Sequence, residues 1–62
     1  MMEELKLVAG MLKAAAPYLL ETEVVWSFYN SAVKGNTVEE SVAYALSEWD
    51  LVFPETAEQE KG

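Results

Sequence analysis

The sequence predicts an all-α fold: a small helical hairpin or three-helix unit that completes its core by dimerisation. Three observations support this prediction. Apolar residues recur at alternating spacings of three and four, which is typical of one helix face. Pro17 and the turn Gly35–Asn36 divide the chain into segments of helix length. The 62 residues include no cysteine or histidine, so neither a disulfide nor a structural zinc site supports so small a core.

The charge balance limits the partners that the chain can have. Eleven acidic residues face four lysines and no arginine, which gives a formal net charge of −7. Because lysine and arginine neutralise phosphates, this balance argues against binding to nucleic acid or to an anionic membrane surface. It is compatible with a basic protein partner.

The sequence gives no indication of a membrane protein. The longest apolar run, Ala14–Leu20, contains Pro17 and is much shorter than the roughly 20 residues that a spanning helix needs. Glu3 and Glu4 stand where an export signal carries positive charge. We therefore expect a cytoplasmic protein.

The first expected helix covers residues 3–16. Glu3 and Glu4 lie in its first turn, where negative charge is favourable for the helix dipole. Gly10 weakens a helix interior, and two interpretations stay open. With Ala14, four residues on, it lets another backbone approach closely, or it is a tolerated exposed glycine.

Pro17 predicts a break or a kink. A proline inside a helix removes a hydrogen bond, whereas the first position of a new helix tolerates it well. Because the apolar pattern continues in register beyond Pro17, residues 3–34 are expected to form two helical segments with a break or kink near Ala16 and Pro17. That pattern is the predicted oligomer or core interface, made of Leu5, Val8, Leu12, Ala15, Leu19, Trp26, Tyr29 and Val33.

The segment "EVVWSFYN", residues 23–30, is ambiguous between helix and strand. Its β-branched and aromatic residues favour a strand. No hairpin signal and no second strand-like run accompany it, so we predict a helix. A helix that is apolar over most of its circumference is normally buried on more than one side.

A third helix is expected to begin at Thr37. Gly35 ends the preceding helix, and Thr37 with Glu40 fits a capping box. One face then carries Val38, Val42, Ala45, Leu46 and Trp49, and the acidic residues lie mostly on the other. For Trp26 and Trp49 we favour one shared core over interface anchors. We expect residues 1–53 to form a single helical domain and residues 54–62 a disordered acidic tail.

The sequence does not predict catalysis. The commonest general base, histidine, and the best nucleophile, cysteine, are both missing. Carboxylate pairs such as Glu39 with Glu40 are neighbours in sequence and do not share a helix face. We therefore predict no catalytic, cofactor-binding or metal-binding residue and no cofactor.

The favoured function is a small acidic non-enzymatic protein-interaction module, such as an adaptor, regulator or inhibitor. It would act as a homodimer with two-fold symmetry, as most homo-oligomers do. A basic protein site is the partner that its acidic surface would fit. The predicted partner surface consists of Glu39, Glu40, Glu48, Trp49 and Asp50.

The alternative function is a DNA-binding transcriptional regulator. The segment "KGNTVEESVAYALSEW", residues 34–49, resembles the turn and second helix of ribbon–helix–helix repressors, with "VVWSFY", residues 24–29, in place of their strand. The resemblance implies DNA binding through that strand. The family's strand precedes its first helix and carries basic residues, whereas this segment follows a helix and has none, so we rank this function below protein interaction.

Overall fold

The computed structural model describes residues 2–54 and contains three α-helices and one 3-10 helix. These are α1 (Met2–Ala15), the 3-10 helix η1 (Ala16–Tyr18), α2 (Glu21–Ala32) and α3 (Val38–Glu48). Within the described residues there is no strand, so the all-α prediction is confirmed. Because residues 24–29 are helical, the strand that the likeness to ribbon–helix–helix repressors requires is absent from that segment.

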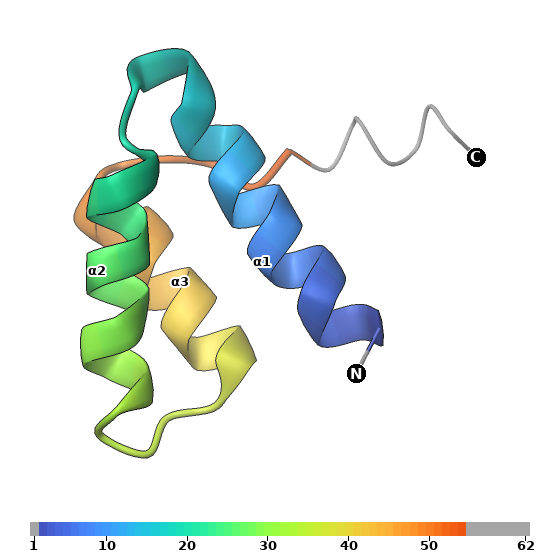
Figure 1. The fold of residues 1–62 in the computed structure, drawn as a ribbon, viewed down its shortest axis with the longest axis vertical. Coiled ribbons are helices and arrows are strands. Elements are labelled where there is room, and N and C mark those ends of the chain that lie inside the picture. The colour runs from blue at the N-terminus through green and yellow to red at the C-terminus, as the bar shows by residue number, and fades with distance from the viewer. Residues whose placement is uncertain (1, 55–62) are drawn as a thin grey trace.

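The three helices form a flat molecule. Figure 1 shows α1 and α2 joined through η1 at one end, with α3 lying between them. α3 packs against both other helices and most extensively against α2. The Cα atoms extend over 34 × 27 × 14 Å. Domains are usually built from two packed layers of secondary structure, each of which covers one face of the other. A molecule this thin lacks a second layer, so the outer faces of its helices stay uncovered.

The core is small and draws on all three helices. Its fully buried apolar residues are Met11, Ala15, Val24, Val42, Ala45 and Leu46. Partly buried side chains, among them Leu7, Leu20, Phe28 and Leu51, surround this cluster. The stripe predicted for the third helix is confirmed at Val42, Ala45 and Leu46, because these side chains face α1 and α2.

Pro17 lies in a complete break between two helices, not in a kink of one helix. It occupies η1, and Leu19 then adopts a left-handed backbone conformation with φ 60°. A right-handed helix cannot continue through such a residue. The backbone N–H of Leu20 donates to the carbonyl of Ala15 at 3.1 Å, and α2 begins at Glu21.

The turn between α2 and α3 has the predicted chemistry. Gly35 has φ 96°, a conformation that costs glycine little. The Thr37 hydroxyl accepts from the backbone N–H of Glu40, and the Glu40 carboxylate accepts from that of Thr37, each at 3.0 Å. The capping box is therefore confirmed, and it fixes the start of α3.

Gly10 has a packing role that differs from both sequence interpretations. It is buried, so it is not an exposed glycine, and its close neighbour is a side chain and not a backbone. After α3 the chain runs back across α1 (Figure 1), where the Phe53 ring occupies the place that a Cβ of Gly10 would take. Of the predicted tail, residues 54–62, only Pro54 is within the described residues, and it is partly buried.

Candidate functional site

Helix α2 buries two serines and exposes several large apolar residues. Its inner face, toward α3, buries Val24, Ser27 and Ser31. The opposite side carries the large apolar residues, and we call it the outer face of α2: Val25, Trp26, Tyr29 and the C-cap residue Val33. A helix at a protein surface normally points its apolar stripe toward the core and its polar residues toward water.

The outer face is one continuous stripe. Trp26, Tyr29 and Val33 follow at spacings of three and four, which places them above one another on a helix, and Val25 lies beside them. The side chains are 61% (Trp26), 54% (Tyr29), 59% (Val33) and 45% (Val25) exposed. None of them carries a charge, so the stripe has the composition of an interface centre.

The two aromatic rings of the outer face are ordered against each other. The Trp26 and Tyr29 ring centroids are 6.0 Å apart and the ring planes are inclined by 89°, an edge-to-face contact. Edge-to-face pairs contribute about 0.5–1.5 kcal/mol beyond the area they bury. The rings therefore restrain each other while most of their surface is open to solvent.

The inner face of α2 combines Val24 with two buried serines whose hydrogen-bonding groups are satisfied. Ser31 accepts from the Ser41 hydroxyl at 3.1 Å and from the Asn36 side-chain amide at 3.0 Å. The indole N–H of Trp49 donates to the Ser27 hydroxyl at 3.1 Å. Among the described residues, every buried side-chain nitrogen or oxygen has a hydrogen-bond partner. The buried serines thus avoid the penalty of an unpaired polar group.

Small residues form the buried contact between α2 and α3. Ser27 and Ser31 on α2 meet α3, whose buried face holds Ser41 and Ala45, both without exposed surface. The distance between packed helices depends on the side chains at their contact, and small side chains allow a close approach. Val25, Trp26, Tyr29 and Val33 lie on the opposite side of α2, whereas Phe28 is partly buried against the core.

The structure disperses the interface residues predicted from the sequence. Ala15 is buried in the core, Val8 and Leu12 are partly buried, and Leu5 and Leu19 are exposed. Trp26, Tyr29 and Val33 stay together, on the outer face of α2. The expectation that Trp26 shares the chain's core with Trp49 is wrong, since Trp26 is mostly exposed.

The predicted partner surface is split between the two ends of α3. Its five members, Glu39, Glu40, Glu48, Trp49 and Asp50, are all exposed. Glu40 and Glu48 are eight residues apart, a rise of about 12 Å along a helix. Glu40 also serves the capping box, and the Trp49 indole is bonded to Ser27. Within one chain these residues do not form a single patch.

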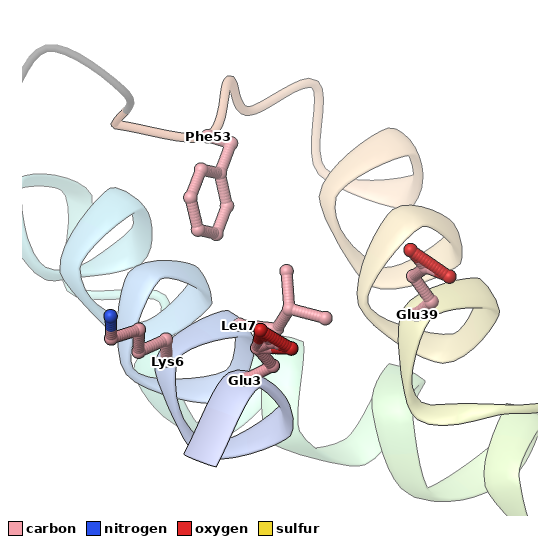
Figure 2. Close-up of a pocket in the computed structure, with 5 residues that line it drawn as sticks. All are labelled: Glu3, Lys6, Leu7, Glu39 and Phe53. Carbon is pink, nitrogen blue, oxygen red and sulfur yellow. The ribbon is translucent and has the colours of Figure 1, made fainter. Parts of the chain in front are cut away.

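One open depression lies between α1, α3 and the segment after α3. Its volume is about 400 Å³, and Figure 2 shows its lining residues Glu3, Lys6, Leu7, Glu39 and Phe53. Leu7 and Phe53 supply apolar surface, whereas the three charged side chains are of mixed sign. Sequence reasoning missed this feature because only the chain reversal after α3 brings Phe53 over α1. Its mixed lining selects no single class of ligand.

Comparison with known proteins gives no relative for this chain: no protein family matches it, and neither a curated protein nor a solved structure is significantly similar to it. No helix of residues 2–54 is long and apolar enough to cross a bilayer. In the same part of the chain, no three metal-ligating side chains are grouped so that they could hold an ion. The outer face of α2 is therefore the feature from which a function can be argued.

Proposed function

We propose that this protein is a small acidic protein-interaction module without catalytic activity, an adaptor, regulator or inhibitor, which binds through the outer face of α2. One observation supports this proposal above all others. On α2, serines are buried and Val25, Trp26, Tyr29 and Val33 are exposed. Contiguous exposed apolar surface on a small protein marks a site of interaction.

The residue types of this face favour a protein as the ligand. Trp and Tyr are enriched among the residues that dominate binding energy, and charged residues are depleted at the centres of interfaces. Trp26 and Tyr29 already contact each other in the unbound chain, so little side-chain freedom is left to lose on binding. Nucleic acid would instead require basic groups, of which the stripe has none.

The acidic residues at the two ends of α3 provide separate, charged contacts. Glu39, Glu48 and Asp50 are exposed and lie outside the apolar stripe. Such groups steer and select a partner with basic side chains more than they add affinity. The module would therefore present an uncharged contact on α2 and acidic contacts on α3.

Site-specific photo-crosslinking in cells that naturally produce the protein tests this proposal. A benzophenone amino acid replaces Tyr29 on the outer face of α2, and in a matched control it replaces Tyr18, which is similarly exposed in η1 and belongs to neither proposed contact. We expect covalent protein adducts from position 29 and few from position 18. If position 29 yields no protein adduct, or no more than position 18, the outer face is not a binding surface.

A further inference from the structure

We infer that a second copy of this chain covers the outer face of α2, with the two α2 helices antiparallel about a two-fold axis near Tyr29. This inference rests on the proposed function, because it names the occupant of the same face. Three properties of the described residues lead to it: the symmetry of the stripe, its area and the charges at its edge.

The stripe is self-complementary about its middle. Val25 and Trp26 lie at one end, Val33 lies at the other, and Tyr29 lies between them. A two-fold axis near Tyr29 sets Val33 of one copy against Val25 and Trp26 of the other, so each bulky indole meets a smaller side chain. Such a contact uses the same patch on both copies and closes after two, as in most homo-oligomers.

The exposed area suits a weak dimer. Aromatic side chains bury about 150–250 Å² each, so the exposed parts of Trp26 and Tyr29 alone offer on the order of 200 Å² per copy. Val25, Val33 and the flanking surface add to this area, and a specific interface requires roughly 1,000 Å² over the two copies. A second copy also supplies the second layer that a molecule 14 Å thick lacks.

The charges beside the stripe distinguish antiparallel from parallel pairing. Positions 23, 30 and 34 lie along one flank, since they are seven and four residues apart and the C-cap Val33 keeps a right-handed helical backbone. Antiparallel helices bring this flank against the same flank of the partner, which sets Lys34 near the partner's Glu23. Parallel helices would instead set this flank against the opposite flank of the partner, where Lys34 faces Ala32 and not Glu23. Antiparallel helix dipoles also attract.

A charge swap measured by sedimentation equilibrium tests the arrangement. Wild type is expected to dimerise with a dissociation constant in the micromolar range. Lys34→Glu or Glu23→Lys alone puts like charges at both flanks of the dimer and raises that constant roughly tenfold. A 1:1 mixture of the two variants restores both ion pairs and associates as tightly as wild type. Lys13→Glu on α1 is the control, because it changes the net charge by the same amount as Lys34→Glu. We expect it to leave the dissociation constant within about twofold of the wild-type value.

Three results would overturn the inference: a wild-type chain that stays monomeric to millimolar concentration, single variants that associate like Lys13→Glu, or a mixture that is not rescued. The crosslinking experiment at position 29 shows whether only the dimer inference fails or the proposed function fails as well. An adduct with twice the mass of the chain supports the second copy. Adducts with other proteins alone overturn it and leave the interaction module standing.

Discussion

Helices α2 and α3 are neighbours of similar length, yet they expose different kinds of residue. α3 buries Val42, Ala45 and Leu46 and exposes its glutamates, as its sequence pattern predicts. α2 buries Ser27 and Ser31 and exposes its two largest aromatic residues. Both helices satisfy their buried polar groups, so the difference lies in what remains on the outside.

Within one chain the apolar stripe of α3 is covered, whereas the outer face of α2 is not. The side of α3 that is left to solvent is acidic and needs no cover. The outer face of α2, which is also left to solvent, consists of uncharged residues and carries the Trp26–Tyr29 contact. Since apolar burial is the main favourable term in folding and association, the outer face of α2 is the surface with most to gain from a partner.

The largest expected effect is the difference between two adjacent valines, Val24 on the inner face of α2 and Val25 on its outer face. Val24→Asp places an unpaired carboxylate at a position without exposed surface, which costs about 3–5 kcal/mol, as much as a core of this size supplies. Val25→Asp changes the half-exposed neighbour. We expect circular dichroism to show loss of helix for Val24→Asp and retention for Val25→Asp. Equal loss for both would mean that α2 does not have an inner and an outer face as described.

The second-largest effect concerns the contact between Gly10 and Phe53, which lies within one chain. Gly10→Ala favours the helix by roughly 1 kcal/mol but displaces the Phe53 ring, at a cost of about 1–3 kcal/mol. We therefore expect a lower free energy of unfolding in urea. In a Phe53→Ala background the same substitution should raise it. If Gly10→Ala is stabilising in both backgrounds, Phe53 does not pack on Gly10.

The third effect probes the inner face of α2. Ser27→Ala removes the acceptor of the Trp49 indole N–H and is expected to lower the free energy of unfolding by about 1 kcal/mol. With Trp49→Phe already present the donor is gone, so Ser27→Ala should then cost much less. Equal costs in the two backgrounds would show that the bond does not contribute to stability. Trp26→Phe, on the outer face, is the matched change with little expected effect on the single chain.

The smallest effect lies on the exposed side of α3. A hydrogen bond to the Glu48 carboxylate, together with its negative charge, raises the pKa of Tyr44 above its ordinary value of about 10. The folded state therefore favours protonated Tyr44. The stability that this provides is present below the unfolded pKa and is lost as pH rises through the folded one. Glu48→Gln should lower the Tyr44 midpoint in a carbon NMR titration, and an unchanged midpoint would contradict the interaction.

The sequence predicted the fold where local chemistry decides it. The capping box of Thr37 with Glu40 and the glycine at position 35 specify the start of α3 and the turn before it, and both are found. The helical interpretation of residues 23–30 is also confirmed. Lack of a pairing strand outweighed β propensity there, because propensity yields to tertiary context.

The sequence predicted the buried side of α3 but not that of α2, and that of α1 only in part. Of the predicted seam on α1, Ala15 is buried and Leu5 is exposed, whereas the buried Gly10 and Met11 were not part of it. On α2 the apolar pattern predicts that the outer face is buried. Nothing in a single sequence shows that the serines of α2 will instead pack against Ser41. Such an inversion depends on how closely two helices approach, which becomes visible only when both are in place.

Fluorine NMR of the chain labelled with 5-fluorotryptophan compares the two tryptophans in one experiment. Trp26 reports on the outer face of α2 and Trp49 on the inner contact with Ser27. The resonance of Trp26 is expected to lose its sensitivity to H₂O–D₂O exchange as concentration rises from micromolar to millimolar, while that of Trp49 stays unchanged. A Trp26 resonance that remains fully solvent-sensitive at the highest concentration would contradict self-association through α2.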